Sequence, residues 1–224
     1  MEVLFEDNHL IAINKSVKEI VQSDKSGDLS LEEQLKKYIK DKYKKPGNVF
    51  LGVTHRIDRP VSGVVLFART SKSLTRLNQM FKDKEVKKIY WAIVREKPPK
   101  DSDTLIHFLT RDTNKNKSYV SDKEKKGSKP AMLSYRILDK SEQYYLLEID
   151  LQTGRHHQIR SQLSKIGCPI RGDLKYGYPR SNADGGISLH SRIIEFNHPV
   201  NHAHIKIIAD PPEDKLWNFF KNRN

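Results

Sequence analysis

Residues 55–63, HRIDRPVSG, place one carboxylate among basic and turn-forming residues. Asp58 lies between Arg56 and Arg59, whose positive charges favour its ionised form. Apolar stretches on either side indicate strands, so we expect Asp58 at a turn where a strand ends. Turns held on a rigid sheet often carry catalytic groups, whereas an aspartate in a turn also often hydrogen-bonds its own backbone. This stretch alone leaves the catalytic and the structural interpretation open.

A second stretch, TGRHHQIRSQL at 153–163, brings two arginines near the start of an expected helix. Arg155 and Arg160 would add positive charge to a helix N-terminus, which by itself favours anions. An ordinary basic surface helix has the same composition. An ion pair between an arginine of this helix and a buried Asp58 would, however, explain both stretches together.

Other catalytic chemistries have weaker support. The chain contains neither a Walker phosphate loop nor a G-x-G-x-x-G motif, and Ser62 lacks the first glycine of a nucleophile elbow. Two histidine pairs, His156 with His157 and His202 with His204, have no acidic or cysteine partner at metal-site spacing. A metal site is therefore the less favoured interpretation.

The elements that must position these residues are mostly strands. Helices are expected at 30–43, 71–83, 155–167 and around 213–222, and the first opens with a capping box of Ser30 and Glu33. Two short strands are expected within residues 2–15, joined by a turn at 6–9, with further strands at 49–53, 63–69, 87–96, 104–109, 117–121, 131–138, 144–152, 187–196 and 203–209. The pattern predicts the α+β class, with a mixed, largely antiparallel central sheet flanked by helices.

Length and composition indicate a single domain over residues 1–224. The mean hydropathy is -0.71, and the longest wholly apolar run, 64–68, is far too short to cross a bilayer. Acidic residues near the N-terminus do not fit a signal peptide, and the single cysteine, Cys168, excludes an internal disulfide. We therefore expect a cytoplasmic protein and, in the absence of a readable long apolar patch, a monomer.

The charge points to a polyanionic partner. The chain carries 41 lysines and arginines against 28 aspartates and glutamates, a formal net charge of +13. Such an excess favours nucleic acid, because the cations neutralise phosphates and release counterions, although a lysine-rich soluble protein would share it. Basic stretches at 36–45 and 114–129 could contact a phosphate backbone, and each could equally be a solvated helix face or loop.

Several motifs together resemble the RluA-type pseudouridine synthase family. HRIDRPVSG is similar to its H-R-L-D-x-x-x-S-G motif, and TGRHHQIR is similar to its T-G-R-x-H-Q-I-R motif. GDLKYG at 172–177 resembles G-D-x-x-Y-G, and KKIYWAIV at 87–94 resembles the K-x-Y-x-A strand. KPAMLSY at 129–135 and LHSRIIEFNHP at 189–199 also fall in the family's order. The resemblance extends over nearly the whole chain.

The resemblance implies an isomerase, an RNA pseudouridine synthase that converts specific uridines in a structured rRNA or tRNA stem-loop without a cofactor. It implies that Asp58 is the catalytic aspartate, which acts as a nucleophile on the sugar or helps to form a glycal. Arg160 matches the arginine that pairs with this aspartate and keeps it charged. Tyr90 matches the tyrosine that stacks on the target base and could also transfer a proton.

The target base must leave its stack before it can react. By resemblance, Arg56 fills the vacated space, and Arg155, His157 and Gln158 support the site or contact RNA; DNA is not expected as a partner. The stretch KSVKE at 15–19 replaces the family's K-P-x-G, which leaves the conformation of this turn open. We expect no separate small N-terminal RNA-binding module of the kind that many relatives carry, so that the catalytic domain would select the RNA.

Two alternatives compete with this interpretation. A non-catalytic RNA-binding protein on the same fold would be expected to lack Asp58, Tyr90 or Arg160, which are all present. A hydrolase that uses Asp58 as its nucleophile needs a second carboxylate or magnesium ligands, and the sequence near Asp58 shows neither pattern.

Overall fold

A computed structural model of the chain describes residues 1–23 and 27–224. Its strands are β1 (Glu2–Glu6), β2 (Leu10–Lys15), β3 (Gly52–Val53), β4 (Ser62–Ala68), β5 (Lys87–Val94), β6 (Ser102–Asp112), β7 (Lys117–Ser121), β8 (Lys129–Lys140), β9 (Tyr145–Leu151), β10 (Leu189–Asn197) and β11 (His204–Ile208). The helices are α1 (Leu31–Lys42), α2 (Ser71–Lys82), α3 (Gln158–Lys165) and α4 (Lys215–Lys221), with a short 3₁₀ turn, η1, at Leu174–Tyr176.

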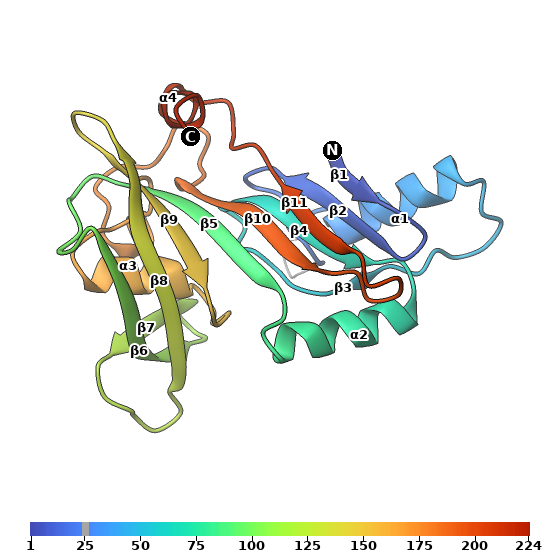
Figure 1. The fold of residues 1–224 in the computed structure, drawn as a ribbon, viewed down its shortest axis with the longest axis horizontal. Coiled ribbons are helices and arrows are strands. Elements are labelled where there is room, and N and C mark those ends of the chain that lie inside the picture. Colours follow the sequence, from blue (N-terminus) through green and yellow to red (C-terminus); the bar gives the residue numbers. More distant parts are fainter. Residues whose placement is uncertain (24–26) are drawn as a thin grey trace.

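All these strands belong to one 11-stranded sheet (Figure 1). The strand order is β1-β2-β4-β10-β5-β9-β8-β6-β7, with β3 paired to β4 and β11 paired to β10. The β4–β10 pair is parallel, and the other pairs in the described residues are antiparallel. The expected α+β class with a mixed, largely antiparallel sheet is confirmed.

The central strands are buried on both faces. Successive side chains of a strand point to opposite faces, and in β5 Tyr90 and Ala92 join the largest core cluster whereas Trp91 and Ile93 join another. Helices α1 and α3 pack on the face of Tyr90, and α2 and α4 contribute to the clusters on the opposite face. The sheet is thus a core layer between helices, which gives it the rigidity to hold a site.

Local sequence signals fixed several element boundaries. The capping box before α1 is present, because Ser30 Oγ accepts from the Glu33 backbone N–H while Glu33 accepts from that of Ser30. Gly167 follows α3 with a φ of 82°, the left-handed conformation expected after a helix C-terminus. In the described part of the chain no helix has the length and apolar character needed to span a membrane.

Several expected boundaries differ from the structure, and two of the differences lie next to the site. The stretch 49–53 forms a strand only at Gly52–Val53. The helix expected at 155–167 begins at Gln158, because His157 has a φ of 52° and cannot continue a right-handed helix. Arg155 therefore lies in the turn before α3 and does not belong to the helix.

Candidate active site

The segment that carries Asp58 leaves the sheet through side-chain hydrogen bonds. Thr54 Oγ1 donates to the Leu66 carbonyl at 2.5 Å, and the Leu66 backbone N–H donates to His55 Nε2 at 3.0 Å. These side chains take the partners that a longer β3 would have used, which explains why β3 ends at Val53. Burial, together with the charge of Lys88, lowers the pKa of His55 to about 3, so its ring stays neutral and can accept.

Lys15 fixes the turn that contains Asp58. Its side chain is fully buried, and Nζ donates to the carbonyls of Ser16, Arg59 and Val61 at 2.8, 3.1 and 2.8 Å. The Val61 N–H closes the turn by donating to the Asp58 carbonyl at 3.0 Å. Burial lowers the pKa of Lys15 to about 8. The sequence showed no sign of this role, because three backbone carbonyls cannot be recognised from residue types.

The turn at 15–19, left open by the sequence, has a defined conformation. The Ser16 backbone N–H donates to Glu19 Oε2 at 2.7 Å, a bond that the family's proline could not make. The Lys18 N–H donates to the Arg59 carbonyl at 3.0 Å. The KSVKE stretch thus forms its own hydrogen bonds and still contacts the Asp58 turn.

The Asp58 carboxylate meets Arg160 across the site. Arg160 Nη1 donates to Asp58 Oδ2 at 3.0 Å. The other side of the guanidinium donates to a second carboxylate, with Nε 2.7 Å from Asp173 Oδ2 and Nη2 2.9 Å from Asp173 Oδ1. Burial opposes the charge of Arg160, but the hydrogen bonds and charges of Asp173 and Asp58 outweigh it and raise the pKa of Arg160. Its guanidinium stays charged beside Asp58.

Asp173 was missed as a partner of Arg160. It lies in the GDLKYG motif, which the sequence singled out without assigning a role to its aspartate. Its side chain is 1% exposed, compared with 28% for that of Asp58. The carboxylate available to a substrate is therefore Asp58, whereas Asp173 is enclosed and orients the arginine.

His157 and Tyr176 close the other side of Asp58. His157 Nε2 lies 3.5 Å from Asp58 Oδ2, and His157 Nδ1 is 3.0 Å from the Tyr176 hydroxyl. That hydroxyl also accepts from the Ser118 backbone N–H at 2.8 Å. Burial, then the positive charge of Arg160, lowers the pKa of His157 to about 2. A neutral imidazole beside Asp58 can donate a hydrogen bond but supplies no positive charge.

The described residues show no group of three or more histidine, cysteine, aspartate or glutamate side chains that could hold a metal ion. Asp58 and Asp173 both face the same guanidinium, which occupies the space between their carboxylates. The site thus consists of a partly accessible carboxylate held by a cation that is itself fixed from behind.

Comparison with known proteins assigns the chain to a family. The family model described as RNA pseudouridylate synthase matches residues 9–165, a segment that contains both Asp58 and Arg160. The chain belongs to the RNA pseudouridylate synthase family. The resemblance found in the sequence motifs is confirmed.

Two curated relatives illustrate the similarity. Ribosomal large subunit pseudouridine synthase C of Buchnera aphidicola is 34% identical over 214 residues, which cover 92% of this chain and 66% of that protein. The tRNA pseudouridine synthase C of Pectobacterium carotovorum is 31% identical over 222 residues, which cover 90% of this chain and 56% of that protein. The chain thus spans less than two thirds of the length of these relatives.

Solved structures of the family share the fold. Human RNA pseudouridylate synthase domain containing 4 matches with a TM-score of 0.81 at 22% identity and covers 99% of this chain and 93% of its own. Human RNA pseudouridylate synthase domain containing 1 matches with a TM-score of 0.74 at 20% identity, over 96% of this chain and 85% of its own.

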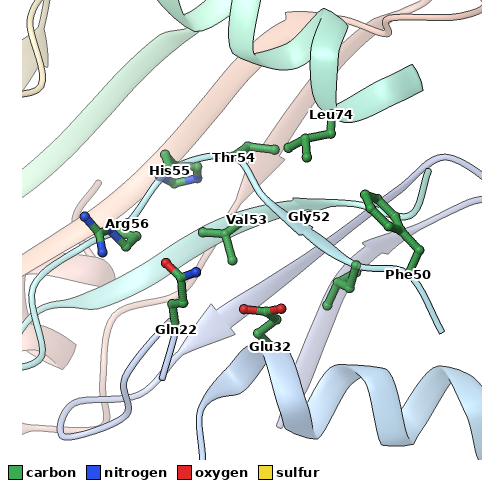
Figure 2. A pocket seen from close by; sticks show the side chains of 10 residues that line it. Gln22, Glu32, Phe50, Gly52, Val53, Thr54, His55, Arg56 and Leu74 are labelled. Carbon is green, nitrogen blue, oxygen red and sulfur yellow. The ribbon is translucent and has the colours of Figure 1, made fainter. Parts of the chain in front are cut away.

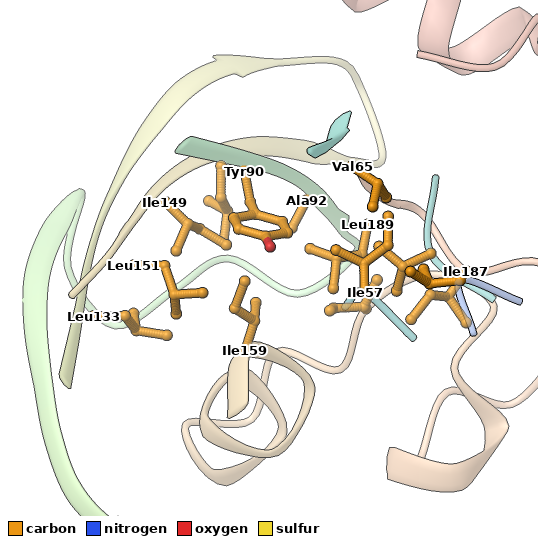
Figure 3. Close-up of a cluster of buried hydrophobic side chains, with 14 of the residues drawn as sticks. Ile57, Val65, Tyr90, Ala92, Leu133, Ile149, Leu151, Ile159, Ile187 and Leu189 are labelled. Atoms are coloured by element: carbon orange, nitrogen blue, oxygen red, sulfur yellow. The ribbon is translucent and has the colours of Figure 1, made fainter. Parts of the chain in front are cut away.

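Tyr90, matched to the family tyrosine, lies in the core beneath the Asp58 turn. Figure 3 shows its ring among Ile149, Ala92 and Ile159, with the hydroxyl directed toward the middle of the cluster. Burial raises the pKa of Tyr90 to about 12, and the negative charge of Asp58 adds to the effect. The hydroxyl is therefore protonated at neutral pH and can donate a proton. Its role toward the base stays a prediction.

The remaining residues matched to the family differ in exposure. Arg56 is exposed at one end of a surface hollow (Figure 2), where it can reach a ligand. Arg155 is exposed, and its Nε donates to the Pro130 carbonyl at 3.0 Å. Gln158 is buried; its amide accepts from the Arg155 N–H and donates to the Met132 carbonyl. Gln158 was expected either to support the site or to contact RNA, and its burial favours support of the site.

Proposed function

We propose that this chain is an RNA pseudouridine synthase that isomerises specific uridines in structured rRNA or tRNA, with Asp58 as the catalytic carboxylate. Membership of the family supports the reaction. The names of its relatives support an rRNA or tRNA substrate. One observation carries the assignment of Asp58: Arg160 holds Oδ2, while Oδ1 has no hydrogen-bond partner in the described residues.

The two carboxylate oxygens of Asp58 have different surroundings, and this arrangement suits either chemical route. A carboxylate whose one oxygen is fixed and whose other is open can attack the sugar carbon C1′, or take a proton from the sugar to form a glycal. In both routes the bond between C1′ and the base nitrogen N1 breaks. A bond between C1′ and ring carbon C5 then forms, while the bond from Asp58 to C1′ breaks in the first route or the sugar regains its proton in the second. In both routes C5 loses its proton and N1 gains one. The charge of Arg160 keeps Asp58 ionised for the first step.

RNA would reach the site with its target base extruded. A base inside a helix cannot approach a carboxylate on a sheet, so unstacking comes before the reaction. Arg56, exposed two residues before Asp58, is placed to stack in the vacated position, since a guanidinium plane can stack on bases and bind phosphate. The net charge of +13 supplies the sequence-independent attraction to the backbone.

Tyr90 would act beneath the extruded base. Its ring is only 6% exposed, so the proposal concerns chiefly its protonated hydroxyl, which can donate a proton to the base or its leaving nitrogen. We extend the proposal to a cytoplasmic location, on the basis of the lone Cys168, and to a monomer, because the sequence shows no long apolar patch. Light scattering during size-exclusion chromatography tests the monomer, and imaging of the tagged protein in its native cells tests the location.

Mapping of pseudouridine in cellular RNA tests the proposed reaction. Total RNA from cells with and without the gene is treated with a carbodiimide that marks pseudouridine, and the stops of reverse transcription are compared. We expect a stop that vanishes with the gene and returns with the intact protein, but not with Asp58→Ala. Asp101→Ala is the matched control, because the Asp101 side chain is 81% exposed and lies in a loop outside the site. A stop restored in full by Asp58→Ala overturns the proposal.

A further inference from the structure

A hollow of about 390 Å³ lies beside the catalytic turn (Figure 2). Residues 50–56 form one wall, Leu74 of α2 borders it, and Gln22 and Glu32 border it from the side of α1. In Figure 2 Phe50 and Arg56 lie toward opposite ends of this wall, with Gln22 and Glu32 near its middle. Because Arg56 belongs to both the hollow and the Asp58 loop, the hollow continues the active site.

The lining suits a nucleobase. Phe50 is 45% exposed, so the face of its ring is open to a ligand. Aromatic and arginine side chains are the groups on which unpaired bases stack. Gln22 makes no hydrogen bond to any residue in the described ranges, so its amide can donate to and accept from the edge of a base.

A second hollow of about 620 Å³ follows directly along the chain. Residues 47–49 line it, immediately before the wall of the first hollow. Its other side is α1, with Lys36 and Lys40, and with Lys37 paired to Asp41 at 2.8 Å. Lys36 Nζ lies 2.6 Å from Glu32 Oε1. This ion pair links the two hollows, and it neutralises Glu32, the acidic residue of the first hollow. Lys40 has no ion-pair partner among residues 1–23 and 27–224, so its charge is available to an anion.

We propose that these two hollows bind the RNA strand next to the target uridine. A flanking base stacks on Phe50, Gln22 bonds to its edge, and the phosphates continue over Lys40 and its neighbours in α1. This inference deepens the proposed function and rests on it. The lysines favour a polyanion over an apolar peptide, and the adjoining aromatic hollow favours single-stranded nucleic acid over a duplex, whose bases are already stacked.

Binding of short single-stranded RNA of mixed sequence tests the track formed by the two hollows. Fluorescence anisotropy at several salt concentrations is measured for the intact chain, Phe50→Ala, Phe50→Tyr and Lys40→Ala. Loss of one base–aromatic stack predicts roughly 5- to 100-fold weaker binding for Phe50→Ala, without a change in salt dependence. Phe50→Tyr keeps the affinity. Lys40→Ala lowers the slope of log affinity against log salt by about 0.7, the value for one lost phosphate contact on a single strand.

Matched controls separate the track from general surface effects. Phe219→Ala removes another exposed aromatic ring, 39% exposed and on α4, and Lys97→Ala removes an exposed lysine from the loop after β5. Both should bind as the intact chain does. Equal binding by Phe50→Ala and Phe219→Ala overturns the proposal, as does a failure of the intact chain to bind this RNA. Photocrosslinking of RNA that contains 5-iodouridine should label the peptide with Phe50.

The binding test of the track and the activity test of Asp58 can fail separately. Asp58→Ala should bind the same RNA as well as the intact chain does and should fail only in pseudouridine formation. If Asp58→Ala still forms pseudouridine while Phe50→Ala binds weakly, the proposed function of Asp58 fails and the track stands. If Asp58→Ala is inactive while Phe50→Ala binds normally, the track fails and the catalytic assignment stands.

Discussion

Arg160 donates one hydrogen bond of 3.0 Å to Asp58 but two, of 2.7 and 2.9 Å, to Asp173. The planar guanidinium can donate along both edges, so the bidentate pair through Nε and Nη2 fixes its plane and leaves Nη1 to donate to the accessible carboxylate. The two aspartates therefore have different tasks although they share one cation. Asp173 sets the geometry, and Asp58 is the carboxylate that a substrate can reach.

This division of tasks predicts different outcomes for the two carboxamide variants. Asp58→Asn should abolish pseudouridine formation with little effect on unfolding, because Arg160 keeps both bonds to Asp173. Asp173→Asn should lower the free energy of unfolding by about 1–3 kcal/mol, the cost of leaving part of a buried charged network unpaired. Urea denaturation monitored by tryptophan fluorescence measures the free energy of unfolding of both variants. Equal stability losses in the two variants would contradict the separation of tasks.

The buried Lys15 predicts that stability rises with pH in an alkaline window. Its folded-state pKa of about 8 lies below the ordinary lysine value of 10.5, so the unfolded chain binds more protons between these values. The contribution of Lys15 to the free energy of unfolding is therefore present above pH 10.5 and lost as the pH falls through 8. By linkage this amounts to at most about 3 kcal/mol.

Lys15→Met isolates that contribution. Other groups titrate in the same window, including Cys168, whose pKa burial raises to about 11. The prediction therefore concerns the difference between the intact chain and Lys15→Met, measured by urea denaturation over the range from neutral pH to the ordinary lysine pKa. Lys15→Met should be less stable throughout, because three carbonyls lose their donor, and its curve against pH should be flatter. Parallel curves would show that Lys15 titrates normally.

Three neutral histidines predict destabilisation by acid. Burial lowers the pKa of His55 to about 3, of His157 to about 2 and of His190 to about 4, against the ordinary value of 6.5. The unfolded chain binds their protons first, so their contribution to stability is present above pH 6.5 and is lost as the pH falls toward these folded-state values. The midpoint of urea unfolding should fall steadily from neutral pH to about pH 4, and His190→Gln should weaken this dependence.

Tyr90 allows its ring and its hydroxyl to be tested separately. Tyr90→Phe keeps the ring in the core and should unfold within about 1 kcal/mol of the intact chain, whereas Tyr90→Ala leaves a cavity and should lose about 3–5 kcal/mol. If the hydroxyl transfers a proton, Tyr90→Phe should bind RNA normally but form pseudouridine far more slowly. RNA binding by anisotropy and the rate of carbodiimide-reactive product give the two readouts. A normal rate for Tyr90→Phe would leave the ring as the only contribution.

Local signals carried much of the secondary structure. The Ser30–Glu33 capping box and the spacing of Leu31, Leu35 and Ile39 on one face fixed α1, because both interactions lie within a few residues. The turn at 6–9 between β1 and β2 followed from short-range chemistry in the same way. The family, too, could be predicted from the ordered motifs, because each motif is a short run of residue types.

The two expected boundaries next to the site were wrong for local reasons, a pair of side-chain hydrogen bonds in one case and a backbone conformation in the other. β3 is short because the side chains of Thr54 and His55 bond to Leu66, and α3 begins late because His157 adopts a left-handed conformation. Neither event changes the apolar periodicity on which the expected boundaries depended. The roles of Asp173 and Lys15 were missed for a related reason, since the partners that define those roles include residues far from them in the chain.

Residue identity and local propensity along the chain were enough to predict the fold class, the order of most elements and the motif that contains Asp58. They could not predict which groups meet, because that depends on how the elements pack. Arg160 lies 102 positions from Asp58, and Lys15 lies 46 from the Val61 carbonyl that it binds. The first contact forms only when α3 packs on the sheet, and the second only when β2 pairs with β4. The burial of those charges then makes one geometry the favourable one.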